Sequence, residues 1–267
     1  MRKNLMLALA VAAIASLSIA ALASAVKLTK TTLRAGNLIV TLGGGASPER
    51  LPRRTFTPVT TTFFGTIKTS DGTHPSALRE VIFDFDKDVK INVKGLPVCR
   101  AGQLEARPTK AAKRVCGKTI LGQGKATAEI AFPEQKPIKV PSPLLVFNGG
   151  ERGGKVTLLI HTFITVPAPT AIVTTVQVQR KGTGLHSIAK IPVIAGGSGS
   201  ALDFNFKIGR TYSYKGKKVG YGEARCPDGV FKVTAKKVLF KNEARIPGVA
   251  AQTVLKGGVA VPCKPKG

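Results

Sequence analysis

The sequence predicts an all-β protein: an antiparallel β-sandwich or a strongly curved sheet of about a dozen strands, with at most one short helix. Two observations lead to this fold class. Short runs rich in β-branched and aromatic residues recur from Leu38 onward, separated by turn-forming residues. Helical periodicity is almost absent beyond residue 25. The chain is long enough for one large β domain or two small ones.

The expected strands follow one another along the chain. An apolar β-branched run at 37–42 ends at the glycines 43–45, and the proline-containing segment 46–58 is expected to be a loop. Apolar and acidic residues alternate at 81–88, which is the period of a half-buried strand. The other expected strands are 60–67, 89–93, 125–132, 143–147, 155–166, 171–180, 187–194, 201–208, 217–225 and 230–240, followed by strand-like segments within 249–261.

The one expected helix is 109–115, with Thr109 as its N-cap and Gly117 as its stop. Residues 26–267 are expected to form a single domain. The glycine-serine stretch 196–200 permits a subdivision there, although a hairpin loop explains it equally well.

The first 25 residues have the features of a signal peptide. A short basic start, Met1 to Asn4, precedes a long uncharged apolar run, and Ala23-Ser24-Ala25 provides the small-x-small cleavage pattern. We therefore expect cleavage after Ala25 and a secreted, extracytoplasmic protein. The alternative is an uncleaved membrane anchor, since the apolar run is close to spanning length. No later segment of the sequence is apolar over a spanning length, so no transmembrane span is expected after cleavage.

Positive charge dominates the composition. The chain contains 41 Lys+Arg and 14 Asp+Glu, and only Arg2 and Lys3 fall in the leader, so the remainder carries 39 minus 14, or +25. Such a charge favours anionic surroundings. An anionic wall polymer, acidic polysaccharide, lipid headgroups or released nucleic acid are candidate partners. Lysine spread over sheet edges also prevents aggregation, so solubility is an equal alternative.

Four cysteines, an even number, predict two disulfides in an exported chain, with three connectivities open. Their spacing matches no zinc site. Sequential pairing, Cys99 with Cys116 and Cys226 with Cys263, is expected because each pair closes a local loop.

Three features of the sequence indicate a family resemblance: the Ala-rich leader, the Gly-Leu-Pro-Val-Cys stretch at 95–99 and the Ala-Arg-Cys-Pro-Asp-Gly stretch at 224–229. In these features the chain resembles uncharacterised exported β-rich proteins of high-GC Gram-positive bacteria. That resemblance implies no known activity, so no functional residue is carried over from it.

Asp84, Asp86 and Asp88 are the densest acidic group in this basic chain, and a strand would place all three on one face. Three carboxylates could bind a hard cation, which makes them the one candidate metal site. The calcium-loop pattern fails, however, because Val89 stands where glycine is needed and Gly95 where the bidentate Glu belongs. We therefore expect a solvated strand face paired with lysines.

No catalytic motif is present, and neither a cofactor nor an enzymatic activity is expected. The glycine-serine stretch 196–200 does not match the nucleophile elbow of serine hydrolases. His161 lies within an apolar strand, where a buried, hydrogen-bonded histidine is the ordinary explanation. His74 and His186 are expected at turn or strand-start positions.

The segment 210–225 combines cations with every tyrosine of the chain. Cations beside exposed rings hold phosphates or sugars by charge and stacking, so this segment is the candidate anion-binding site. The competing interpretation is a lysine-rich hairpin around Gly216 with its tyrosines packed on the sheet. The candidate residues are Arg210, Tyr212, Tyr214, Lys215, Lys217, Lys218, Tyr221 and Arg225.

The sequence is compatible with three functions. The leading hypothesis is a non-catalytic exported protein that binds an anionic component of the cell envelope. The alternative is a carrier that holds an apolar ligand such as a lipid in a curved sheet, suggested by the long apolar strands. An envelope hydrolase is the third, and it is disfavoured by the absent motifs.

Overall fold

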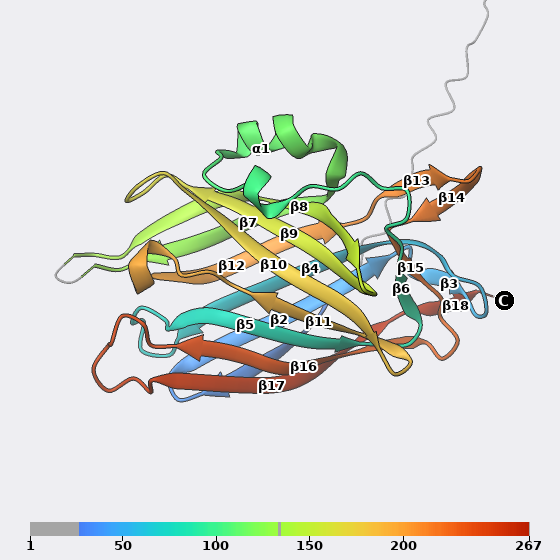
Figure 1. The fold of residues 1–267 in the computed structure, drawn as a ribbon. Coiled ribbons are helices and arrows are strands. Elements are labelled where there is room, and N and C mark those ends of the chain that lie inside the picture. Colours follow the sequence, from blue (N-terminus) through green and yellow to red (C-terminus); the bar gives the residue numbers. More distant parts are fainter. Residues whose placement is uncertain (1–26, 133–134, 267) are drawn as a thin grey trace, which may run out of the picture.

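A computed structural model describes residues 27–132 and 135–266, of which 62% are in strands and 7% in helices. One antiparallel sheet dominates it and curves round until it is nearly closed, with strands in the order β1-β2-β4-β12-β7-β8-β9-β10-β11-β5-β16-β17 (Figure 1). The predicted all-β class is therefore confirmed, in its curved-sheet form. The expected signal peptide and its cleavage site lie outside the described residues.

Most neighbours in this sheet are also neighbours in sequence, joined by short turns. The strands are β1 (Thr29–Ala35), β2 (Leu38–Ser47), β4 (Thr57–Thr69), β12 (Gly199–Ile208), β7 (Ile120–Ile130), β8 (Ile138–Arg152), β9 (Lys155–Ile164), β10 (Thr170–Lys181), β11 (Gly184–Lys190), β5 (Ala77–Phe85), β16 (Val230–Lys241) and β17 (Gln252–Pro262).

The two edge strands, β1 and β17, lie next to each other without forming a hydrogen-bonded ladder in the described part of the chain. Side chains pack there: any side chain at Gly257 of β17 would overlap Leu33 of β1. The sheet is thus closed by packing along this seam and by backbone hydrogen bonds elsewhere.

Smaller pairings lie at one end of the sheet. The strand β15 (Gly222–Ala224) pairs with both β4 and β6 (Val89–Ile91), β13 (Thr211–Tyr214) forms a hairpin with β14 (Lys217–Gly220), and β3 (Arg50–Pro52) runs parallel to β18 (Lys264–Lys266). In Figure 1 these pieces lie at the right-hand end of the curved sheet, where the β13–β14 hairpin projects outward.

The only α-helix of the described residues, α1 (Thr109–Cys116), covers part of the outer face of the sheet. Short 3₁₀ turns flank it at η1 (Ala101–Gln103) and η2 (Gly117–Thr119), and a third, η3 (Ala195–Gly197), precedes β12. Ala112 and Leu104 pack with the outward-facing Leu145, Phe147 and Leu159 of β8 and β9. The sheet is therefore buried on both sides here, which explains the continuous apolar run 143–147 within β8.

Both expected disulfides are present, Cys99–Cys116 and Cys226–Cys263, and no described cysteine is free. The first bond joins the two ends of the segment that contains η1 and α1, which is called the cover segment below. Disulfides persist in oxidising compartments, so the pair indicates an extracytoplasmic environment. No helix in 27–132 or 135–266 has the length and hydropathy needed to cross a membrane.

Several expected boundaries were wrong. The strand β2 continues through the glycines 43–45 to Ser47, because its pairing with β4 runs on to Ser47. Residue 43 has to be glycine, since a side chain there would overlap Phe64 of β4 and the Thr29 carbonyl of β1. The expected loop 46–58 contains β3, and β1 was not expected at all. At α1 the N-cap is Pro108 rather than Thr109, whereas Gly117 is the C-cap as expected.

The expected strand 81–88 ends at Phe85, because residues 86–88 form a turn. A carboxylate oxygen of Asp86 accepts a hydrogen bond from the Asp88 backbone N–H, which stabilises this turn. Asp84, Asp86 and Asp88 consequently do not share a strand face, contrary to the expectation. The stretch 196–200 spans η3 and the start of β12, which pairs within the main sheet.

Candidate functional site

An apolar cavity of about 360 Å³ lies along the inner face of the curved sheet. Alternate residues of each strand point inward, so the cavity receives one apolar row from most strands. Along β10, for example, Ile172, Val176 and Val178 line it. One end of the space is lined by Ile164 and Ile194, and the opposite end of the strands by Ile208 and Tyr221.

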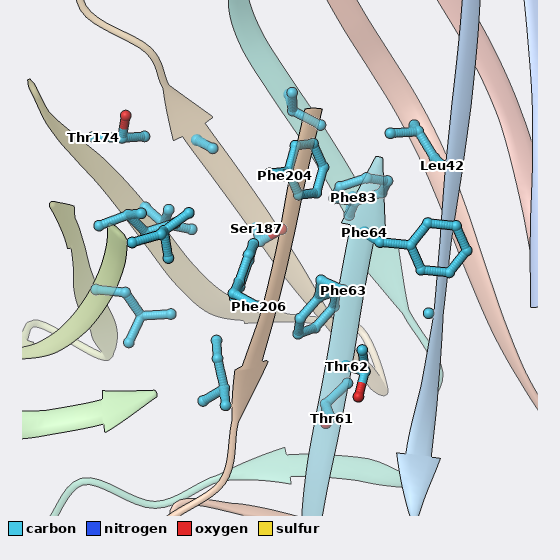
Figure 2. A pocket seen from close by; sticks show the side chains of 18 of the residues that line it. Leu42, Thr61, Thr62, Phe63, Phe64, Phe83, Thr174, Ser187, Phe204 and Phe206 are labelled. Atoms are coloured by element: carbon cyan, nitrogen blue, oxygen red, sulfur yellow. The ribbon is translucent and has the colours of Figure 1, made fainter. Parts of the chain in front are cut away.

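Phenylalanines from three strands form the centre of the lining (Figure 2). Phe63 of β4 stacks on Phe206 of β12 with ring centroids 5.4 Å apart, and it meets Phe85 of β5 edge-on at 6.4 Å. Phe204 and Phe83 extend the group along their own strands. β4 and β12 are direct neighbours, whereas β5 reaches Phe63 from across the interior. The aromatic contacts therefore connect facing walls of the sheet.

One glycine makes this arrangement sterically possible. Gly65 pairs with Phe204 in the β4–β12 register, and a Cβ at Gly65 would lie 2.6 Å from the Phe204 ring. The ring therefore lies flat across β4. A side chain at position 65 would push the ring into the cavity.

Polar side chains interrupt the lining at ten of the described positions: Lys90, Thr61, Thr62, Thr127, Ser142, Thr162, Thr174, Ser187, Asp203 and Tyr221. Two of their hydroxyls, on Ser142 and Tyr221, are buried without a hydrogen-bond partner among the described residues. Burial raises the pKa of Tyr221, so its phenol stays protonated at neutral pH.

The cation at the edge of the cavity is neutralised locally. The Lys90 ammonium lies 2.8 Å from Glu223 and 4.6 Å from the Phe56 ring centroid. Burial alone would raise the pKa of Glu223, but hydrogen bonds from Lys90 and from the Gly220 backbone N–H leave it lowered. Glu223 is therefore a carboxylate that takes up the charge of Lys90.

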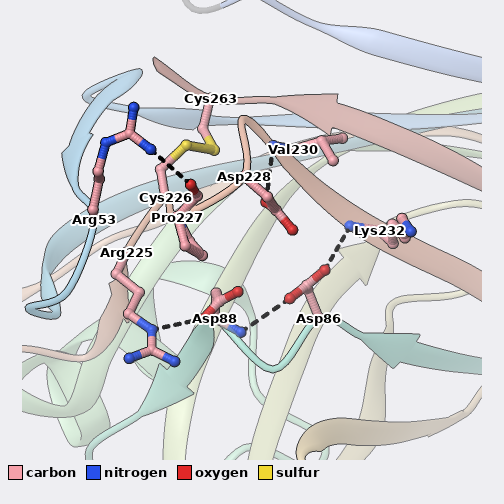
Figure 3. Close-up of a disulfide and its surroundings, with 10 residues drawn as sticks. All are labelled: Arg53, Asp86, Asp88, Arg225, Cys226, Pro227, Asp228, Val230, Lys232 and Cys263. Carbon is pink, nitrogen blue, oxygen red and sulfur yellow. Dashed lines mark hydrogen bonds and ion pairs between the residues drawn. A yellow bond between two sulfur atoms is a disulfide. The ribbon is translucent and has the colours of Figure 1, made fainter. Parts of the chain in front are cut away.

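The three predicted acidic residues have separate partners. Asp84 on β5 lies opposite His186 on β11 and is close to Lys236. Asp86 accepts from the backbone N–H groups of Asp88 and Lys232 (Figure 3). Asp88 is fully buried and pairs with Arg225 at 2.6 Å. Within 27–132 and 135–266, no group of three acidic, histidine or cysteine residues is arranged to hold a metal ion.

The predicted anion-binding residues do not form one surface. Lys215, Lys217 and Lys218 are exposed on the β13–β14 hairpin, with Lys215 and Gly216 at its turn. The tyrosines face inward: Tyr221 is buried, Tyr212 packs against the core, and Tyr214 lies against Gly95.

The two arginines of this segment have partners inside the protein. Arg210 donates to the carbonyls of Lys118 and Ile120, and Arg225 donates to Asp88. Three exposed lysines are thus what the segment offers to an anion.

A serine, a histidine and a glutamate that the sequence did not connect meet on the outer side of the sheet. Ser200 Oγ lies 3.2 Å from His74 Nε2, and His74 Nδ1 lies 2.9 Å from Glu129. The order matches a catalytic triad, but Ser200 is only 2% exposed and its single proton points to the Pro75 carbonyl at 2.5 Å. None of the three lines the cavity. The group connects the segment before β5 to β7 and β12.

No protein-family model, curated protein or solved structure matches the chain.

Proposed function

We propose that this protein is an extracytoplasmic carrier that holds an apolar small molecule inside its curved sheet. The observation that carries the proposal is the apolar cavity beside the phenylalanines of β4, β5 and β12. Its volume of about 360 Å³ falls within the range of small-molecule sites, roughly 300–1,000 Å³.

The size of the cavity also means that an unfilled core would lower the stability of the folded protein. Protein interiors are normally packed as densely as organic crystals. Unfilled apolar space of this size costs free energy, because the side chains along its lining lose their contact partners. An apolar ligand that occupies the space would recover much of this free energy.

A cavity-filling variant tests the proposal. Thr174 of β10 lines the cavity, whereas Gln177 of the same strand is exposed. We expect Thr174→Phe to weaken binding of the neutral fluorophore N-phenyl-1-naphthylamine at least tenfold, and Gln177→Phe to leave it unchanged. Native mass spectrometry of protein isolated from the exported fraction should also detect a bound apolar molecule. Absence of binding by the wild type, or equal losses in both variants, would refute the carrier.

We also propose that the protein is secreted after cleavage behind Ala25. Outside the cytoplasm, a carrier can take its ligand from the envelope. The two disulfides support an oxidising destination. The intact mass of the exported protein should therefore match a chain that begins at Val26.

The charge supports a second proposal, that the surface also associates with an anionic wall polymer, acidic polysaccharide or lipid headgroups. Reversing Lys215, Lys217 and Lys218 to Glu should weaken such binding more than reversing the equally exposed Lys27, Lys30 and Lys266. With duplex DNA as a surrogate, log affinity should fall with log salt by about 0.9 per neutralised phosphate. Equal losses in the two triple variants would show a diffuse charge effect and exclude the hairpin.

A further inference from the structure

The cover segment presents a strongly basic surface on the outside of β8 and β9 (Figure 1). The stretch 98–118, which contains this segment, has six cations and a single acidic residue, Glu105. All six cations are exposed, and none of them forms an ion pair within 27–132 or 135–266. They are Arg100, Arg107, Lys110, Lys113, Arg114 and Lys118.

The cations of α1 oppose the stability of the helix itself. Lys110, Lys113 and Arg114 are three and four residues apart, so they share the outward side of the helix, whereas Ala112 and Cys116 are buried. Like charges at this spacing repel each other, and no acidic residue in the first turn of α1 offsets them. An anionic surface facing α1 would neutralise this repulsion.

Two exposed valines lie among these cations. Val98 is 53% exposed and Val115 is 43% exposed. They directly precede Cys99 and Cys116, whose Cα atoms are 5.7 Å apart in the disulfide, so the bond brings the two valines near each other. Apolar side chains beside cations suit the interface of a lipid bilayer, where the cations meet headgroup phosphates and the apolar groups enter between the headgroups.

The cover segment is fixed in place without a partner. The fully buried Asn148 donates from its side chain to the Pro97 carbonyl at 2.8 Å, and its own carbonyl accepts from the Cys99 backbone N–H at 2.9 Å. The Arg107 carbonyl accepts from the buried His161. Binding through a segment that is already ordered avoids the entropy cost of ordering it.

The β13–β14 hairpin adjoins the cover segment. A Cβ at Gly95 would overlap the Tyr214 ring, and the Arg210 guanidinium donates to the Lys118 carbonyl. The exposed lysines 215, 217 and 218 of the hairpin therefore continue the basic surface beyond α1 (Figure 1).

We infer that the protein docks on a lipid bilayer with anionic headgroups through the cover segment, with α1 facing the bilayer. This inference rests on the association with anionic envelope material proposed above. It names the lipid surface as the partner and the cover segment as the contact. The cations meet the headgroup phosphates, and Val98 and Val115 enter the interface between them.

A charge-removal variant tests the contact with the full mature protein. Binding is measured to vesicles of phosphatidylcholine mixed with phosphatidylglycerol and to vesicles of phosphatidylcholine alone. The Lys110→Gln/Lys113→Gln/Arg114→Gln variant should bind the anionic vesicles about a hundredfold more weakly, which is about fivefold per cation. Wild-type binding should be much weaker on phosphatidylcholine alone.

The matched control removes the same charge elsewhere. Lys68, Lys190 and Lys241 are exposed on β4, β11 and β16, and all three are changed to Gln. Charges farther than about 10 Å from the bilayer are largely screened, so this variant should change binding by about twofold at most. Urea unfolding of both triple variants shows that they fold.

The apolar contact has a test of its own, because the chain contains no tryptophan. The emission of Val115→Trp should shift to shorter wavelength on the anionic vesicles, whereas that of Val254→Trp, at another exposed valine, should not. The Val98→Ser/Val115→Ser variant should bind these vesicles about fivefold more weakly. Its binding to soluble polyphosphate should equal that of the wild type, because a polymer in water offers no apolar interior.

The outcomes separate the inference from the proposals it rests on. If the wild type does not bind the anionic vesicles, the inference and the lipid association both fail, while the carrier keeps its separate fluorophore test. If the two triple variants lose affinity equally, the association is diffuse and the cover segment is not the contact. Binding to polyphosphate without an emission shift of Val115→Trp on vesicles would overturn the lipid surface in favour of a polymer.

Discussion

His161 lies completely buried between the outer face of β9 and the segment that precedes α1. Its Nε2 is 2.9 Å from the Arg107 carbonyl, and its Nδ1 has no partner among the described residues. Burial lowers the pKa of His161, and the hydrogen bond to Arg107 opposes this only in part. The ring is therefore neutral, with Nε2–H as the donor, which is the ordinary structural role expected from the sequence.

This histidine should make folding sensitive to acid. The folded protein resists protonation where the unfolded chain, with a histidine pKa of 6.5, accepts it. Stability is therefore complete above about pH 6.5 and falls as the pH drops toward the lower folded pKa, by at most about 1.4 kcal/mol per pH unit. Urea unfolding at about pH 7.5 and pH 5.5 should show a smaller difference for His161→Gln, whose amide can still donate to Arg107. An unchanged difference would contradict this assignment.

At the scale of elements, the Cys99–Cys116 bond holds the cover segment of η1 and α1 against β8 and β9. Its 17-residue separation corresponds to about 3 kcal/mol of loop entropy. The Cys99→Ser/Cys116→Ser variant should therefore lose about that much stability. Its amide hydrogen exchange should accelerate at 100–119 and along β8 and β9.

The second disulfide supplies the control for that variant. Cys226 and Cys263 are 37 residues apart, so the Cys226→Ser/Cys263→Ser variant should lose about 4 kcal/mol. Its faster exchange should lie at β3, β15 and β18, where Leu51, Ala224 and Cys263 share a cluster. Faster exchange over 100–119 in this second variant would show that the two staples do not act locally.

For the whole molecule, the charge excess should oppose folding. The part beyond residue 25 carries +25, and salt screens the repulsion between these charges. Raising NaCl from about 10 to 300 mM should increase the Tm by about 2–4 °C, equivalent to about 1 kcal/mol for a domain of this size. A fall in Tm by calorimetry would mean that ion pairs such as Lys237–Glu80 outweigh the repulsion.

Much of the fold could be predicted because its signals are local. Alternating apolar residues, turn residues and cysteine spacing each act over a few positions, so they indicated the strand series, α1 and both disulfides. The end of β2 was misplaced because a distant strand decided it, with Phe64 of β4 lying across Gly43. The end of β5 was misplaced because the Asp86 side chain forms a turn with the backbone N–H of Asp88.

The site could not be predicted in the same way. A serine at 142 and a tyrosine at 221 have no distinctive pattern in the sequence, and they line one cavity only because the sheet curves until β1 approaches β17. Likewise, the sequence did not show that the lysines of 210–225 lie on an exposed hairpin while Arg210 and Arg225 bind partners within the protein. The sequence by itself determined the all-β class, its strand series and its staples. The tertiary structure alone decided the closure and the cavity, because curvature and register depend on contacts between residues far apart in the chain.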